Sequence, residues 1–289
     1  DPLQTLNPTG FNWGRIQAMF AKHPPYNKDP DNVGRMVKPN SIKQNYRSSA
    51  NIVKFANGIQ RMRMKYDSVE PRMMTSERSP IKEPAKLIVI PESHRKEIEQ
   101  VIVKKIEKSA QTRVCWILWA TDDQQAVEIV AQDSILKQLS SENNDEEDIN
   151  PYFSLTSVKG LEFQFSLLYK FGEKLQKEIG HHVGEKSNSE SITLAEKFAY
   201  NRWYVSATRA LDTVYIIEDE EGAKFWRLAK ESGDISDDIQ VIDTLDGILE
   251  ILRGPDFEPS INYSEDNLEK QYRRYQTQGS LNSLKSAIH

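Results

Sequence analysis

The fold is decided by residues 152–171, which read YFSLTSVKGLEFQFSLLYKF. Two apolar runs in this stretch, 152–156 and 163–171, are rich in aromatic residues and predict strands, and a polar turn containing Gly160 joins them. Similar short runs recur on both sides of this stretch, and segments with helical periodicity separate them. This alternation is typical of an α/β protein with a parallel sheet.

The same reading gives the other elements of the sheet and its helices. Further strands are expected at 87–90, 114–119 and 213–218. Ser48 and Ser49 precede apolar residues at helical spacing, which predicts a helix capped by a serine hydroxyl. Additional helices are expected at 97–107, 123–139 and 193–204. Thr193 and Glu196 have the spacing of a capping box at the start of the last one.

The composition is that of a globular protein with a sizeable core. Of the 289 residues, 38% are hydrophobic and 28% are charged, and the formal net charge is −5. This charge argues against a globally basic nucleic-acid binder but is compatible with a local basic groove. We expect neither a membrane span nor a secretory leader. The single cysteine, Cys115, favours a reducing cytosolic setting, or a nuclear one in a eukaryote.

Two polar or helical regions flank this predicted core. Residues 24–40 contain four prolines and several turn-forming residues, which indicates a linker. Beyond residue 220 the pattern becomes helical, and a further helix is expected to begin near Ser264.

Three phrases carry groups suited to nucleotide chemistry. They are QNYRSS at 44–49, TSVKGLEF at 156–163 and WYVSATRA at 203–210. Each places a charged or phosphate-seeking group where a strand or loop meets a helix, which is a common position for a nucleotide site in an open α/β sheet.

Together with the opening residues DPLQ at 1–4, these phrases resemble motifs III to VI of the UvrD/Rep/PcrA-like DNA helicases of superfamily 1, in that order. The resemblance implies a RecA-like fold of the kind found in phosphate-loop NTPases. It implies that residues 1–30 are the tail of a first RecA-like domain with its linker, and that 31–219 form the second RecA-like domain. Residues 220–289 are then a helical C-terminal extension.

Arg47 and Arg209 are the candidate catalytic arginines. The planar guanidinium fork stays charged and suits the charge that spreads over a γ-phosphate during transfer. The family resemblance implies that both act as arginine fingers toward ATP held by another domain. The alternatives are that Arg47 caps or pairs near a helix start, and that Arg209 lies on a solvated helix face.

Gln4 is the third candidate catalytic residue. The resemblance implies that it senses the γ-phosphate and couples the nucleotide to DNA, and a neutral amide can both donate to a phosphate oxygen and accept from water. Downstream, Phe11 and Trp13 are candidate DNA contacts, because an aromatic ring can stack on a base. Packing of the two rings beside a turn is the alternative.

The phrase at 156–163 is expected to serve two ligands. The resemblance implies that Glu162 accepts hydrogen bonds from the ATP ribose, and Gly160 allows close approach of the backbone. Thr156 and Ser157 are placed to hold a DNA phosphate by hydroxyl and backbone N–H, with Lys159 as a second anchor. A strand–turn–helix junction with polar capping is the alternative.

No phosphate loop of the form Gly-x-x-x-x-Gly-Lys-Ser/Thr occurs in the 289 residues. Without that loop the chain is not expected to hydrolyse ATP alone. We expect ATP and Mg²⁺ as cofactors, with the metal ligands and the phosphate loop supplied by the missing N-terminal RecA-like half. The chain is thus expected to be the C-terminal part of a longer helicase.

A histidine-containing segment at 180–187, GHHVGEKS, imitates a phosphate loop without its spacing. We interpret it as a flexible loop. No cysteine or third ligand converges on His181 and His182 in the sequence, so no metal site is expected there.

The leading hypothesis is an ATP-dependent DNA helicase or translocase, moving 3′ to 5′ by family resemblance, on single-stranded or partly duplex DNA. One alternative is a noncatalytic helicase-derived scaffold, with the C-terminal helices docking a partner protein. An RNA helicase of the same superfamily is the third hypothesis, and it is disfavoured because the phrase KGLEF resembles the DNA branch.

Overall fold

The computed structural model describes residues 44–67, 73–77, 83–106, 114–137, 152–183 and 192–257. The candidates Gln4, Phe11 and Trp13 lie outside these residues, as do the expected linker at 24–40 and the helix expected from Ser264. The candidates Arg47, Thr156, Ser157, Lys159, Gly160, Glu162 and Arg209 all lie within them.

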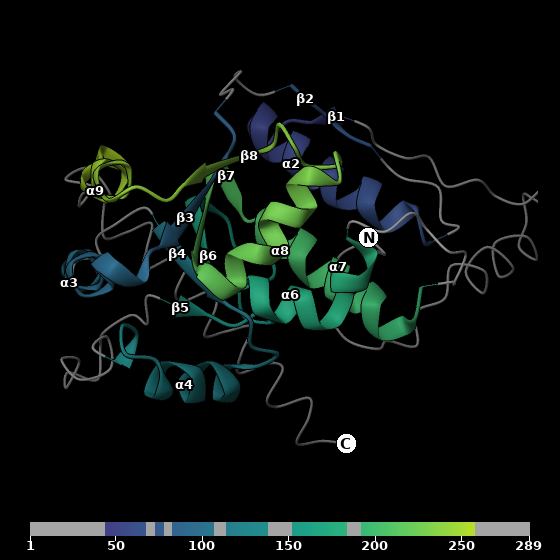
Figure 1. The fold of residues 1–289 in the computed structure, drawn as a ribbon. Helices are drawn as coiled ribbons and strands as arrows, with labels where there is room; N and C mark the ends of the chain where they lie inside the picture. Colours follow the sequence, from purple (N-terminus) through teal and green to yellow (C-terminus); the bar gives the residue numbers. More distant parts are fainter. Residues whose placement is uncertain are drawn as a thin grey trace, which may run out of the picture.

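A six-stranded sheet forms the centre of the described part of the chain (Figure 1). Its strands are β3 (Ala85–Ile90), β4 (Val114–Leu118), β5 (Tyr152–Phe153), β6 (Phe163–Tyr169), β7 (Ala210–Asp219) and β8 (Ile239–Ile242). They lie in the order β5-β4-β6-β7-β3-β8, and every neighbouring pair is parallel. A separate parallel pair joins β1 (Gln44–Asn45) to β2 (Thr75–Ser76). The predicted α/β class with a parallel sheet is confirmed.

Apolar side chains on both faces of the sheet explain why its strands read as continuous hydrophobic runs. In β3, Leu87 and Val89 enter one hydrophobic cluster, while Ile88 and Ile90 enter a second. Successive side chains of a strand point to opposite faces, so the two clusters mark the two faces of the sheet.

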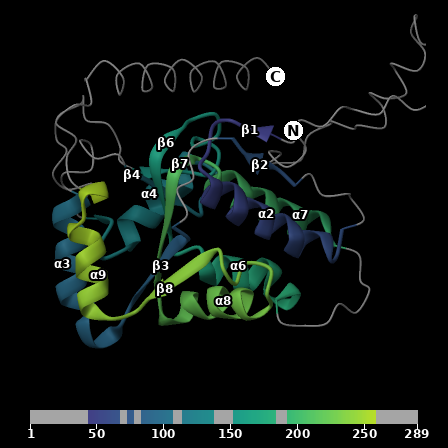
Figure 2. The same cartoon turned by 90° about the horizontal axis from the view of Figure 1, so that it is seen from above.

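Helices cover both faces. They are α2 (Ala50–Met64), α3 (Arg95–Ile106), α4 (Asp123–Gln132), α6 (Gly172–Ile179), α7 (Leu194–Ala207), α8 (Glu220–Glu231) and α9 (Leu245–Arg253). Buried residues of α2, α6, α7 and α8 belong to the first cluster, and those of α3, α4 and α9 to the second. Figure 2 shows α3 beside α9 on one side of the sheet, with α2 beside α7 and α6 beside α8 on the other. The architecture is a three-layer sandwich.

The five predicted strands are present, but some predictions about the helices are wrong. The helix expected over 123–139 ends at Gln132. Ser49 is the N-cap of α2, yet its hydroxyl makes no capping bond and instead donates to the Asp212 carbonyl at 2.8 Å. The capping box of Thr193 with Glu196 is confirmed at the start of α7.

The region after residue 219 is not helical throughout. Strand β8 pairs in parallel with β3 and extends the central sheet, while α8 and α9 bury apolar residues on its two faces. Residues 220–257 therefore build the same sheet and its covering layers. Among the described helices, none has the length and apolar character needed to cross a membrane.

Candidate functional site

Three distant segments meet at the amino ends of β6 and β7. The backbone N–H of Phe163 donates to the Arg209 carbonyl at 3.0 Å, and Phe163 pairs with Ala210 where the two strands begin. Parallel pairing therefore sets Glu162 and Arg209, which directly precede these strands, at the same edge of the sheet. The N-terminal side of α2 completes the group with Arg47.

Arg47 connects the three segments. Its Nη1 donates to Glu162 Oε1 at 3.1 Å, and its Nη2 donates to the Thr208 carbonyl at 2.7 Å. The turn that carries Arg47 is fixed by Asn45, whose Oδ1 accepts from the backbone N–H groups of Arg47 and Ser48 at 2.8 and 2.9 Å. The turn before α2 is therefore fixed by these bonds, and it positions the Arg47 side chain.

Arg209 is held more deeply than Arg47. Its side chain is engaged by the Val205 carbonyl at Nε (3.0 Å), the Leu161 carbonyl at Nη1 (3.3 Å) and Thr208 Oγ1 at Nη2 (3.3 Å). Only 2% of the residue is exposed. Burial, and then the nearby charge of Arg47, lower the pKa of Arg209 to about 10. The side chain remains charged at neutral pH, and it ties the end of α7 to the segment before β6.

The charges of this group favour an anion. Arg47 and Arg209 contribute two positive charges and Glu162 contributes one negative charge, so the three side chains together carry a net charge of +1. Glu162 is exposed and the Arg47 guanidinium is partly exposed, so both can meet a ligand from solvent. An ion pair of this exposure contributes at most about 1 kcal/mol, which makes it easy to exchange for a ligand contact. We call Arg47, Glu162 and Arg209 the arginine cluster.

Gly160 shapes the turn that presents Glu162. Its φ is +90°, a left-handed conformation that favours glycine. A Cβ atom at this position would meet no heavy atom within 4 Å. The need for glycine is therefore conformational, and the space beside it is open for a close approach to the backbone.

The other half of the same phrase contacts different neighbours. The Thr156 hydroxyl donates to the Thr121 carbonyl. Ser157 Oγ lies 2.8 Å from Ser154 Oγ, which in turn donates to Asp123 Oδ1 at 2.7 Å, in the first turn of α4. These bonds fix the 154–157 turn against the segment after β4.

Lys159 and the hydroxyls of this turn do not join the arginine cluster. The Lys159 side chain is exposed. The Thr156 hydroxyl bonds the β4–α4 junction directly, and Ser157 reaches it through Ser154. The structure therefore splits residues 156–162 between two surroundings. One half faces the β4–α4 junction, and the other half faces Arg47 and Arg209.

Tyr46 is a further candidate residue that the sequence interpretation did not select. It lies directly before Arg47, is 69% exposed, and donates its hydroxyl to Gln44 Oε1 at 2.7 Å. A large exposed aromatic ring can stack on a nucleobase. The available signal was an aromatic residue shortly before a predicted helix, next to a candidate arginine finger.

Comparisons with known proteins add no relative to this geometry. A scan against protein-family models found no match, and a search of curated proteins found no similar sequence. The functional assignment therefore depends on the four sequence motifs and on the arrangement of Tyr46, Arg47, Glu162 and Arg209. In that arrangement the exposed ring of Tyr46 directly precedes Arg47, which pairs with Glu162.

Proposed function

We propose that this chain is the second RecA-like half of an ATP-dependent DNA helicase or translocase. The observation that carries the proposal is the convergence of Arg47, Glu162 and Arg209, from three segments of the chain, at the amino ends of β6 and β7. These are the residues that the resemblance to UvrD-like helicases marks as nucleotide contacts. Their net positive charge suits a polyphosphate.

Within this proposal the two arginines act differently. Arg47 is partly exposed and its ion pair with the exposed Glu162 is of the kind that contributes little, so it can exchange Glu162 for an oxygen of a γ-phosphate while Nη2 keeps its bond to the Thr208 carbonyl. Arg209 is buried and bonded to the carbonyls of Val205 and Leu161. It therefore adds positive charge without meeting the ligand directly, and it holds the end of α7 against the segment before β6. We propose Arg47 as the residue that reaches the phosphate, with Arg209 supporting it.

Neighbouring side chains would contact the ribose and the adenine base of ATP. Glu162 is exposed and accepts hydrogen bonds, which suits the hydroxyls of a ribose. Tyr46 offers its exposed face to the adenine ring. Gly160 keeps the adjoining backbone open to the ligand.

The chain would contribute one side of the nucleotide site. It has no phosphate loop, so a second domain has to supply the backbone cradle and lysine for the β- and γ-phosphates together with the carboxylates for Mg²⁺. Closing and opening of the two halves around ATP would then drive movement along DNA.

We place DNA at the 154–159 turn. Its hydroxyls and backbone are fixed against the β4–α4 junction, and Lys159 presents an exposed ammonium group beside them. Lysine side chains bind backbone phosphates, and the hydroxyl bonds within the protein hold the turn that presents Lys159. The turn adjoins the arginine cluster through Gly160 and Leu161, which gives a short route between nucleotide and DNA.

The test is the DNA-stimulated ATPase rate of the natural polypeptide that carries these residues. Arg47→Ala is expected to lower the rate about 10³-fold, the lower range for an arginine finger. The matched control is Arg227→Ala, an exposed arginine of α8 that pairs with Glu220 and lies outside the cluster. Wild-type activity of Arg47→Ala would overturn the proposal.

A noncatalytic scaffold is the second candidate function, and the burial of Arg209 favours it. A guanidinium that is bonded to two carbonyls and is 2% exposed can serve stability alone. The two functions separate in one experiment. If the chain is a scaffold, the natural polypeptide shows no DNA-stimulated ATP hydrolysis, and substitution of Arg47 leaves the ATPase rate unchanged.

A further inference from the structure

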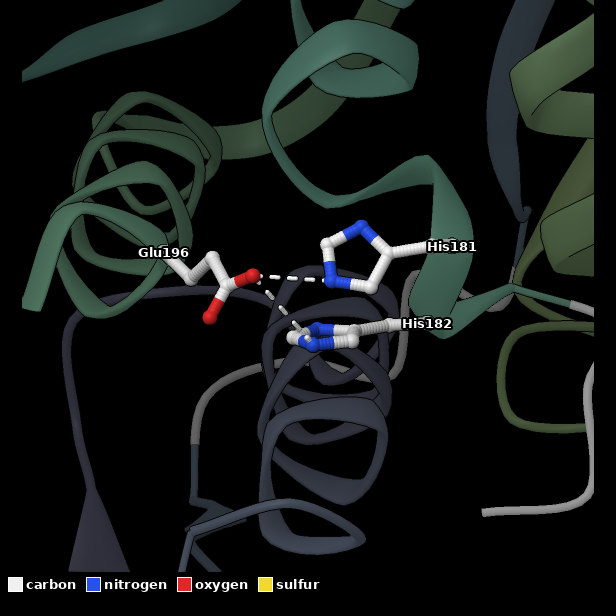
Figure 3. Close-up of side chains that lie close together, drawn as sticks. All are labelled: His181, His182 and Glu196. Carbon is white, nitrogen blue, oxygen red and sulfur yellow. Dashed lines mark ion pairs between the residues drawn. The ribbon is translucent and has the colours of Figure 1, made fainter. Parts of the chain in front are cut away.

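A second cluster of ionisable side chains lies at the start of α7, at the other end of this helix from Arg209. Figure 3 shows the imidazoles of His181 and His182, from the short 3-10 helix Gly180–His182, pointing toward the carboxylate of Glu196 in the first turn of α7. Candidate ligand atoms of the three residues all lie within 4.8 Å of one another. We call these residues the histidine cluster.

This finding corrects the expectation that no third ligand converges on His181 and His182. Glu196 was identified from the sequence only as a capping-box residue. The fold brings it next to the histidines because α6 and α7 pack on the same face of the sheet. Its Oε1 lies 2.8 Å from His181 Nε2 and 3.8 Å from His182 Nε2.

Two of the three ligand separations are close to those of a metal site. Ligands held about 2.0 to 2.1 Å from a tetrahedral Zn²⁺ lie about 3.3 Å from one another. The distances from Glu196 Oε1 to the two imidazole nitrogens, 2.8 and 3.8 Å, lie on either side of that value, and all three ligand atoms lie within 4.8 Å of one another. Imidazole and carboxylate are both ligands that Zn²⁺ accepts.

Neighbouring groups orient the histidine cluster. His182 Nδ1 lies 3.2 Å from the hydroxyl of buried Tyr200, which leaves Nε2 directed at Glu196. The ring is stacked on Tyr66 with centroids 3.9 Å apart, and its side chain is 5% exposed. A hydrogen bond at the far ring nitrogen is the usual support of a metal-bound histidine.

Glu196 is fixed as firmly as His182. Its Oε2 accepts from the backbone N–H of Thr193 at 2.6 Å and from the Thr193 hydroxyl at 2.7 Å. The capping box therefore occupies one carboxylate oxygen and turns the other toward the imidazoles. The carboxylate is positioned before any cation arrives, which lowers the entropic cost of binding.

We propose that His181, His182 and Glu196 bind a divalent transition-metal ion, with Zn²⁺ as the best fit, and that the ion fastens α7 to the 3-10 helix. The His181 side chain is 59% exposed, so solvent can complete the coordination. The 14 residues of α7 separate this site from Arg209 by about 20 Å, at 1.5 Å of rise per residue. The role is therefore structural and independent of the proposed nucleotide site.

The experiment is an isothermal calorimetric titration of the 289-residue chain with Zn²⁺ alone, after a chelator has removed any bound metal. We expect a site that disappears or weakens at least about tenfold in Glu196→Gln and in His182→Asn. Glutamine at this capping-box position still closes the box, so Glu196→Gln retains the start of the helix. The control is His94→Asn, an exposed histidine that lies outside the cluster.

A second readout identifies the ligands directly. Co²⁺ bound in place of Zn²⁺ should give the intense visible absorption of a four-coordinate site, and Tyr200→Phe should weaken Zn²⁺ binding about tenfold through the loss of support at Nδ1. Absence of Zn²⁺ binding, or binding that is unchanged in Glu196→Gln and His182→Asn, would show that the cluster is an ion pair alone and would overturn the proposal.

Discussion

The two ends of α7 carry two clusters of opposite character. At the C-terminal end, Arg47 and Arg209 outnumber the single carboxylate of Glu162, and carbonyl oxygens hold the guanidiniums in place. At the N-terminal end, two imidazoles face the carboxylate of Glu196. The proposed anion site and the proposed cation site therefore lie at opposite ends of one helix, about 20 Å apart.

In both clusters, neutral hydrogen-bond partners orient a charged side chain without neutralising it. Backbone carbonyls orient Arg209 without cancelling its charge, since each is a neutral acceptor. Thr193 likewise orients Glu196 with neutral donors and leaves its charge intact. In both clusters the neighbouring groups fix the position of the charged side chain, and its charge stays available to attract a ligand of opposite sign.

The largest expected effect separates the roles of the two arginines. Arg209→Ala leaves three hydrogen-bonding neighbours without their donor in a buried site, so the free energy of unfolding should fall by about 3 kcal/mol. Arg47→Ala removes a partly exposed ion pair and a hydrogen bond to the Thr208 carbonyl, so it should cost less, about 1 to 2 kcal/mol. Chemical denaturation of the 289-residue chain measures both values.

Arg63 provides the matched control for a buried arginine. It donates to Asp67 Oδ2 at 2.9 Å and to Asn201 Oδ1 at 2.7 Å, away from the arginine cluster. Arg63→Ala should destabilise the chain to a similar degree, yet leave the ATPase rate of the folded natural polypeptide unchanged. A similar loss of ATPase in both variants would mean that Arg209 acts through stability alone.

Sequence patterns predicted the core of the fold better than its periphery. Strands such as β4 and β7 are buried on both faces, so their composition alone identifies them. The edge strand β8 has four residues, two of which are only partly buried, and its pairing with β3 depends on tertiary contacts. Local composition carries little of that information.

The two clusters differ in the same way. Arg47, Glu162 and Arg209 stand in recognisable phrases, so the sequence marked them before the structure joined them. Glu196 has an ordinary local explanation as a capping residue, and its distance of 14 residues from His182 gives no ligand spacing. Its approach to the histidines follows from the packing of α6 and α7, which no local pattern contains.

Gly160→Ala tests whether the turn before Glu162 acts beyond stability. An alanine at φ +90° is strained by about 1 to 2 kcal/mol. Gly233→Ala is the matched control, because Gly233 has φ +86° and equally open surroundings but follows α8. We expect equal losses of stability and a loss of ATPase activity only in Gly160→Ala. Equal activity in the two variants would count against a nucleotide role for this turn.

Changes of pH should separate the clusters. Arg209 has a pKa of about 10, so it keeps its proton below that pH, and ATP affinity should stay level, within about threefold, from about pH 7 to 9. Imidazoles bind metal only when unprotonated, so Zn²⁺ affinity should fall at least about tenfold as the pH is lowered from about 7.5 through the pKa of His182, which burial holds below that of an ordinary histidine. Calorimetry in matched buffers measures both. A Zn²⁺ affinity that does not fall as the pH is lowered through this range would exclude histidine ligands.

The smallest effect concerns the capping box that orients Glu196. Thr193→Ala removes the hydroxyl that bonds Glu196, and should cost about 1 kcal/mol of stability through the lost cap. Zn²⁺ binding should weaken as well, by about threefold, because the carboxylate keeps only its bond from the Thr193 backbone. Thr244→Ala removes the equivalent cap of α9, where the hydroxyl accepts from Gly247. If the two variants lose similar stability and only Thr193→Ala loses Zn²⁺ affinity, the cap serves the metal site as well as the helix.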